Sequence, residues 1–442
     1  MSSAGDAYWL EHCRKPRTRP ANVEWDVFIS YRSADRIWAL ALYDMLQQAS
    51  YKIFLDQFVL AAGSGILTQI SANLARSASG VLIWSQRTAD SKWVEREVSA
   101  MVERKDKTSS SGFPFSFVVA KLDSEPLPDL LSGNLYIDFS TYPDGPTGAE
   151  LVRLTSGLQG AGLDPAAVAH IAAFETSVRE EPSTLRAMVA ARQFDTIRAR
   201  ACEETPPYTT SATLPALAAQ LLISGGRNED ALAVLDRAQQ RFHSSIRLRQ
   251  LRGLALRRSG RMPDALLELE KLRADGHQDS ETLGILAAAW TDSWKASKNR
   301  DELELACTLY AQAFELTPTD TYCGINAASK SAVLGNLPEA QRLAKSVLTC
   351  LREQAQMRGG QPSSDYWERV TEPEAFLLLR EFEQALKLYH GARIAHQTEV
   401  GSIKSTAAQL DLLVSLPFVP EPWRDRFRQE FKGFWPEQKA ST

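Results

Sequence analysis

The sequence lacks the features that mark secreted, membrane-spanning and nucleic-acid-binding proteins. Its 442 residues contain only five scattered cysteines and no CxxC pair, which is typical of reduced thiols in a reducing compartment. No eighteen apolar residues run together, and the polar N-terminus has no apolar stretch of a secretory signal. The formal net charge of −4 offers no basic field to nucleic acid. We therefore expect a soluble, cytoplasmic protein with neither a nucleic-acid nor a membrane partner.

The composition is that of a multidomain globular chain. Apolar residues make up 44% and charged residues 24%, and the length exceeds what one ordinary core needs. The polar start, with its RKPRTRP segment, predicts a flexible extension. Shifts in composition predict five parts: an extension (1–22), an α/β domain (23–157), a helical linker (158–200), a repeat domain (201–420) and a C-terminal tail (421–442).

Five short apolar runs between 25 and 142 predict a parallel sheet. Stretches with helical spacing lie between the first three runs, and segments such as VFI and VLIW do not alternate polar with apolar residues. Unbroken apolar runs indicate strands covered on both faces, and alternating strands and helices indicate a doubly wound α/β domain. In such a sheet ligands bind beyond the carboxyl ends of the strands. The five runs are WDVFIS (25–30), KIFLD (52–56), GVLIWS (80–85), FSFVVAKL (115–122) and LYIDFS (135–140).

Beyond about residue 160 the sequence becomes helical and repetitive. GRNEDALAVL begins at Gly226 and GRMPDALLEL begins 34 residues later at Gly260, which is the tetratricopeptide period. Weaker copies begin at Gly335 and Arg380. Each copy predicts a turn followed by a helix that packs small alanines against its neighbour, and several such units stack into a solenoid.

The N-terminal motifs resemble those of TIR domains. WDVFISYRSADR resembles the first TIR sequence box, and IFLDQFVLAAGSG resembles the second strand with its BB loop. SKWVEREV (91–98) resembles the SxWxxxE segment of TIR domains that hydrolyse NAD. The resemblance implies a flavodoxin-like α/β TIR domain with a five-stranded parallel sheet, followed by the all-α tetratricopeptide-like solenoid.

The polar tip of the first strand is the first candidate part of a binding site. Ser30, Tyr31 and Arg32 supply a hydroxyl, backbone NH groups and a cation where a dinucleotide would need them. The alternative is that Ser30 only caps the helix that begins near Asp35.

The resemblance implies that Glu97 is the catalytic carboxylate, with Glu95 next in line. Cleaving the nicotinamide–ribose bond creates an oxocarbenium-like centre, and glycoside-cleaving sites set carboxylates against such a centre. No histidine lies between 23 and 142, which excludes a histidine base there, and we expect no metal. The alternative is that Glu97 lies on an ordinary solvated helix face.

Three further residues complete the candidate site. Asp56 is expected either to orient a ribose or to cap its loop, and Gly63 provides the flexible backbone that the BB loop needs. Trp84 is a candidate for stacking on the nicotinamide or the base, and its alternative is a core position. NAD+ is then the substrate, and no cofactor is expected.

The C-terminal half resembles the regulatory region beside the kinase domain of apoptosis-signal-regulating kinases. YAQAFELTPTDTYCGINAAS and DYWERVTEPEAFLLL carry this resemblance. Together the two halves imply an antiphage NAD+ glycohydrolase that assembles through its TIR domains after a cyclic-nucleotide or protein signal. The product, ADP-ribose or a cyclic isomer, stays open, as does whether the helical half senses or inhibits. The alternative function is a non-enzymatic TIR adaptor that binds partner proteins.

Overall fold

The structure is a computed structural model of the chain. It describes residues 9–55, 66–86, 92–131, 136–146, 148–162, 165–209, 211–357, 359–361 and 363–436. By its internal contacts the chain divides into two compact units, Met1–Gln278 and Asp279–Thr442. The predicted boundary at 157 therefore does not separate the units, because the first helices beyond it pack with the sheet domain.

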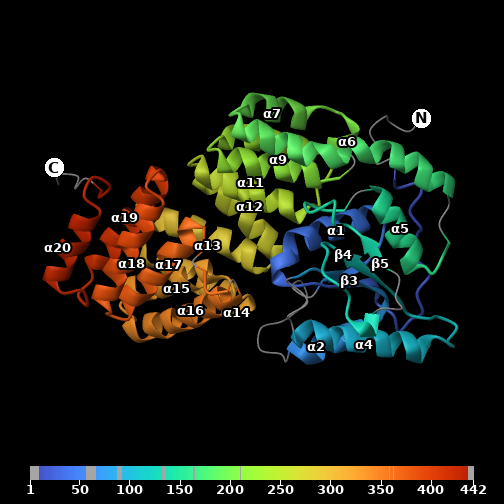
Figure 1. The fold of residues 1–442 in the computed structure, drawn as a ribbon, viewed down its shortest axis with the longest axis horizontal. Helices are drawn as coiled ribbons and strands as arrows, with labels where there is room; N and C mark the ends of the chain where they lie inside the picture. The colour runs from blue at the N-terminus through green and yellow to red at the C-terminus, as the bar shows by residue number, and fades with distance from the viewer. Residues whose placement is uncertain are drawn as a thin grey trace. The chain divides into compact units, whose positions relative to one another are not determined.

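A five-stranded parallel sheet forms the centre of the N-terminal α/β domain within the first unit, which confirms the predicted fold class (Figure 1). The strand order is β2-β1-β3-β4-β5, so the order reverses between β1 and β3. In register, Ile29 lies opposite Leu55 on one side and Val81 on the other. The strands are β1 (Trp25–Ser30), β2 (Ile53–Leu55), β3 (Ser77–Trp84), β4 (Ser116–Lys121) and β5 (Tyr136–Asp138).

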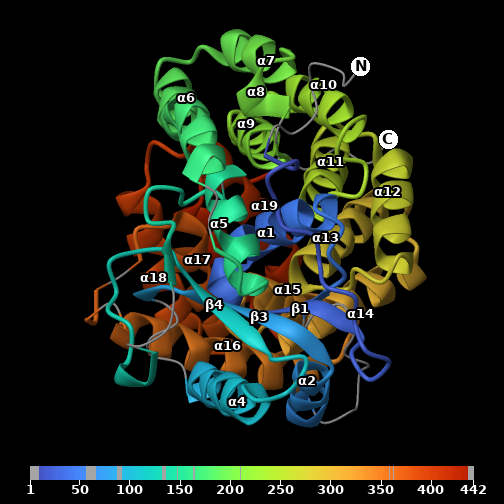
Figure 2. The same ribbon diagram turned by 90° about the vertical axis from the view of Figure 1, so that its right-hand side faces the viewer.

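Helices cover both faces of the sheet, as the unbroken apolar runs predict (Figures 1 and 2). One face packs its strands against α1 (Arg36–Gln48) and α5 (Gly148–Leu158). The other packs against α2 (Ile66–Ala75) and α4 (Lys92–Thr108). Because side chains alternate along a strand, neighbours in the same run enter different cores.

Residues 9–22 are packed, so the predicted flexible extension does not describe them. The indole of Trp9 is fully buried and lies against Gly148, and Cys13 is buried in the same core. The Tyr51 hydroxyl donates to the carbonyl of Arg14 at 2.6 Å, and the Arg17 guanidinium donates to two sheet-domain carbonyls. An aromatic anchor and backbone hydrogen bonds, neither evident from a polar composition, order this segment.

Three helix pairs complete the first unit. The predicted linker is instead the first pair, because α6 and α7 share a buried core with α9 through Leu185, Ile197 and Leu222. The pairs are α6 (Pro165–Ala190) with α7 (Phe194–Cys202), α9 (Thr213–Ser224) with α10 (Asn228–Gln239), and α11 (Ile246–Arg258) with α12 (Met262–Ala274); the short α8 (Pro206–Thr209) precedes α9.

The second unit continues the same helix-turn-helix arrangement. Its final helix carries the buried Phe427 and packs on α18 and α19, so the predicted tail is helical up to Glu430. The helices are α13 (Ser280–Ser297), α14 (Arg300–Leu316), α15 (Thr321–Val333), α16 (Leu337–Met357), α17 (Tyr366–Leu378), α18 (Phe382–Ala395), α19 (Val400–Val414) and α20 (Glu421–Glu430).

Candidate functional site

The candidate site lies at the carboxyl edge of the sheet, where the strand order reverses between β1 and β3. A crevice at such a reversal is where open α/β sheets bind ligands. Two buried polar side chains bridge it: the Ser85 hydroxyl, just beyond β3, donates to the Asp35 carboxylate at 2.7 Å. Asp35 ends the short 3-10 turn (Ser33–Asp35) that follows β1. This hydrogen bond therefore ties the tips of two neighbouring strands together.

The structure brings Ser30, Tyr31 and Arg32 to this edge, as the sequence predicts. Ser30 ends β1 and is 2% exposed, Tyr31 is buried in the α1 core, and Arg32 is half-buried. The Arg32 carbonyl accepts a hydrogen bond from the Asp35 amide at 2.8 Å. The residue at the N-cap of α1 is Asp35, and the capping alternative for Ser30 stays open beside the binding role. The NAD-binding role of the three residues stays a prediction.

Trp84 lies on the sheet face covered by α2 and α4. Its ring is 5% exposed and packs in a core with Phe28 and Met101, and its Nε1 donates to the Pro126 carbonyl at 3.2 Å. This placement favours the core alternative that the sequence left open, because an indole enclosed in this way presents little surface to a ligand.

The remaining predicted residues lie partly or wholly outside the described part of the chain. Asp56 and Gly63 fall outside the described residues, and so does the BB loop that contains Gly63. The backbone of Glu97 belongs to α4, while its side chain, like that of Glu95, lies outside what is described. On the same helix Val98 and Met101 are buried against the sheet.

The edge also holds two further carboxylates, Asp123 at a strand tip of the predicted sheet and Asp138, which the sequence reasoning did not single out. Asp123, just after β4, accepts the backbone amides of Gln86 and Glu125 at 2.8 and 3.0 Å. Hydrogen bonds from Ser140 hold the pKa of Asp138, at the end of β5, below its ordinary value. Asp123 directly follows the run 115–122, whereas Asp138 lies within the run 135–140 and Asp35 lies five residues beyond the run 25–30.

Neither a metal site nor a membrane-spanning helix is found in the parts of the chain that the structure describes. No three His, Cys, Asp or Glu side chains in those parts gather in a way that could hold a metal ion. No described helix combines the length and apolar character that crossing a bilayer requires. The five thiols are all free.

Two family models match the chain. The TIR domain model matches residues 27–154, which contain the sheet and the candidate edge. The Tetratricopeptide Repeats-Sensor model matches residues 227–331, which contain α10 to α14 and most of α15. The chain thus carries a TIR domain followed by a tetratricopeptide sensor region, as its motifs predicted.

One curated relative and several solved structures are similar to parts of the chain. The NAD(+) hydrolase TcpA of Theionarchaea archaeon (strain DG-70-1) is 26% identical over 104 residues, which cover 22% of this chain and 32% of that protein. This chain therefore spans about a third of that relative. A thermophilic TPR protein of Thermus thermophilus is 18% identical, with 44% of this chain and 97% of that chain covered and a TM-score of 0.36. A human IFIT1 dimer is 11% identical, with 92% of this chain and 95% of that chain covered and a TM-score of 0.36.

Proposed function

We propose that the TIR domain cleaves the nicotinamide–ribose bond of NAD+, with Glu97 as the catalytic carboxylate. The observation that carries the proposal is the TIR match over 27–154 together with SKWVEREV on α4 inside it. The relative named as an NAD(+) hydrolase supports the same substrate. NAD+ is consumed as the substrate, so the reaction needs no further cofactor.

The chemistry requires little beyond binding and one well-placed carboxylate. The C1′–N bond breaks, nicotinamide leaves as a neutral ring, and water adds its oxygen to C1′ while releasing a proton. A carboxylate stabilises the positive charge that develops on the ribose in the transition state. Ser30, Arg32 and the backbone amides of the β1 tip bind the diphosphate and ribose in this proposal.

In the same proposal the activity is regulated and serves antiphage defence. Copies of the chain associate through their TIR domains, and the helical region receives a cyclic-nucleotide or protein signal that promotes this association. NAD+ depletion then stops the growth of the infected cell. The two-part architecture supports this regulation, because nothing in the helical region of the sequence suggests chemistry of its own.

The test compares NAD+ consumption by the wild type, Glu97→Gln and the matched control Glu95→Gln at equal folded concentration. Fluorescence of etheno-NAD follows the reaction, with and without a panel of cyclic mono- and dinucleotides. We expect Glu97→Gln to lose activity by on the order of 100-fold or more, because it removes a charge that acts in the transition state. Glu95→Gln should retain activity.

The outcomes separate the alternatives. Loss of activity in Glu95→Gln alone would move the catalytic carboxylate to Glu95. No NAD+ loss by the wild type at any concentration or with any activator would favour the adaptor function instead. Mass spectrometry of the product distinguishes ADP-ribose from a cyclic isomer.

A further inference from the structure

Helix α1 lies between the sheet and the helix pairs of the first unit. Contacts join it to α11, and one stripe of its surface, containing Ile37, Ala41 and Asp44, lines a cavity shared with α9 and α11. The N-terminus of α1 is Asp35, which holds Ser85 at the candidate edge. A single rigid element therefore runs from the candidate site to the helix pairs.

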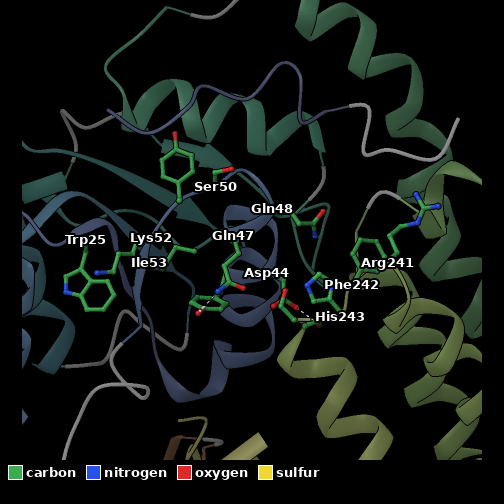
Figure 3. Close-up of a pocket in the computed structure, with 14 residues that line it drawn as sticks. Trp25, Asp44, Gln47, Gln48, Ser50, Lys52, Ile53, Arg241, Phe242 and His243 are labelled. Atoms are coloured by element: carbon green, nitrogen blue, oxygen red, sulfur yellow. Dashed lines mark hydrogen bonds between the residues drawn. The ribbon is translucent and has the colours of Figure 1, made fainter. Parts of the chain in front are cut away.

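A buried hydrogen bond fastens α1 to α11. Asp44 is 5% exposed, and its Oδ2 accepts the hydroxyl of Ser245 at 2.5 Å (Figure 3). Ser245 is 2% exposed and stands at the N-terminus of α11, where its Oγ accepts the Leu248 amide. Next to this bond, Ile246 and Leu272 of the helix pairs belong to the same apolar core as α1. Burying a carboxyl group is costly unless it is hydrogen-bonded, so this contact depends on Ser245.

Cavities border the bond on two sides. One of about 600 Å³ lies between the start of β2, the end of α1 and the turn from Arg241 to Ser245 (Figure 3). The other, of about 340 Å³, follows the α1 stripe toward Asp35. Asp44 lines both cavities. The contact therefore lies at the edge of the packed core, beside two clefts, so fewer neighbouring side chains hold α1 against α11 here than would do so in the middle of the core.

We propose that the Asp44–Ser245 hydrogen bond positions α1, and through it the Asp35–Ser85 contact at the candidate edge, so that displacing the helix pairs disturbs the site. The inference rests on the proposed function for its effect on catalysis. Asp44 and Ser245 are positioning residues, since neither lies at the edge itself.

The electrostatics around Asp44 make the contact sensitive to pH. Burial raises the pKa of Asp44 to about 7, although hydrogen bonds from Ser245 and the Ile246 amide lower it. Besides Asp44 and an ion pair, the ionisable groups that line these two cavities are Asp35, Tyr43, Tyr51, Lys52, Arg241, His243 and Arg247. Asp144 and Arg186, also in the smaller cavity, form an ion pair with each other. Burial favours the uncharged form of Asp44 more than the two hydrogen bonds favour the carboxylate. Keeping Asp44 buried in this contact therefore costs more free energy as the pH rises through about 7 and the carboxyl group becomes charged.

The test uses the full chain with Ser245→Ala, Asp44→Leu and Asp44→Asn, and Ser244→Ala as the matched control. Ser244 is the exposed neighbour of Ser245, so its loss should change nothing. We expect Ser245→Ala and Asp44→Leu to lower kcat by about 10-fold or more, because small misplacement of a reacting group is costly. Asp44→Asn keeps an acceptor for Ser245 and should retain activity close to the wild type at pH 6.

Two readouts separate positioning from general destabilisation. The ratio of wild-type to Asp44→Asn activity should fall by about threefold or more between pH 6 and pH 8.5, since only the wild type loses a proton at this position. Amide hydrogen exchange in residues 31–48 should be about 10-fold faster in Ser245→Ala than in Ser244→Ala. Faster exchange confined to residues 241–250 with unchanged kcat would overturn the proposal, as would a ratio that does not vary with pH.

The exchange experiment also keeps the two proposals apart. If the wild type cleaves no NAD+, the proposed function fails, while exchange in residues 31–35 still decides whether the bond positions the edge. Unchanged exchange there in Ser245→Ala would overturn the positioning inference whatever the activity is.

Discussion

Glu181 shows how one buried carboxylate joins the first helix pairs. Its two oxygens accept the Arg200 guanidinium at 2.8 and 2.7 Å, and the Tyr208 hydroxyl donates to one of them. Burial opposes the charge, but the bonds from Arg200 and Tyr208 outweigh it and hold the pKa of Glu181 below its ordinary value. The three residues come from α6, α7 and α8, so this cluster holds the first three helices of the helical region together.

At the residue scale we predict that Glu181→Gln lowers the free energy of unfolding by roughly 1–3 kcal/mol, because it removes the charge from a buried bidentate pair. Urea unfolding followed by circular dichroism measures the change. A lowered folded pKa makes this contribution full at neutral pH and lost as the pH falls through the acidic range, so the gap between wild type and variant should narrow toward pH 4.

The matched control for this prediction is the exposed neighbour Glu180, for which Glu180→Gln should alter stability by less than about 0.5 kcal/mol. Equal effects of the two substitutions would contradict the role given to the buried cluster.

At the scale of elements, the turns between paired helices have a left-handed residue in common. The four predicted repeat starts, Gly226, Gly260, Gly335 and Arg380, all have positive φ angles between 68° and 89°. Arg192 occupies the same position in the α6–α7 turn, and Lys298, directly after α13, has a positive φ in the shorter α13–α14 turn. Arg192 lies 34 residues before Gly226. This additional copy of the 34-residue repeat is not visible in the sequence because no glycine stands at the start of its turn. The backbone of the turn, rather than its glycine, is the repeated feature.

We predict that Gly335→Ala destabilises the second unit by about 1 kcal/mol, because an L-residue is strained at φ +89° even though nothing lies within 4 Å of the new Cβ. Arg380→Gly should stabilise it by up to about 1 kcal/mol for the same reason. Thermal unfolding of the full chain measures both.

Gly391 provides a control for which the same substitution should change the stability in the opposite direction. It lies inside α18 with open space around it, so Gly391→Ala should stabilise the helix by roughly 0.5–1 kcal/mol. A loss of stability in Gly391→Ala similar to that in Gly335→Ala would show that the turn conformation is not the cause.

At the scale of the whole molecule, the α11–α12 pair contributes to the core of the sheet domain. Fully buried Ile246 and Leu272 lie in the same cluster as α1 and α5. A close contact with α9 adds to this, because a Cβ on Gly145 would come within 2.8 Å of the Thr213 side chain. Cutting the chain at the end of α5 would therefore expose an apolar face.

We predict that a fragment of residues 1–278 unfolds cooperatively. A fragment of residues 1–157 should have an unfolding temperature at least about 10 °C lower, or should aggregate, because α1 loses its packing against α11. Differential scanning calorimetry and gel filtration compare the two. Equal unfolding temperatures for both fragments would show that the sheet domain is independent of the helix pairs.

Local patterns in the sequence predicted most of the elements and part of the site. The apolar runs located both ends of all five strands to within three residues. The tips of these strands pointed to Ser30, Tyr31 and Arg32. The face taken by Trp84 was not predictable, because a strand buried on both sides has no polar face to orient it. The packing of residues 9–22 was missed for a similar reason: one anchoring tryptophan in a polar segment leaves no periodic pattern.

By itself, then, the sequence determined the class of each half, since periodicity, turn residues and the TIR motifs are local properties of the chain. Only the tertiary structure decided which distant residues meet. Ser85 and Asp35 are 50 residues apart in the sequence, and Ser245 and Asp44 are 201 residues apart. Neither pairing can be predicted from a local sequence pattern. These contacts arise because the parallel sheet brings the strand tips together and the helix pairs fold back onto α1. Long-range packing therefore settled how the helical region is joined to the candidate site.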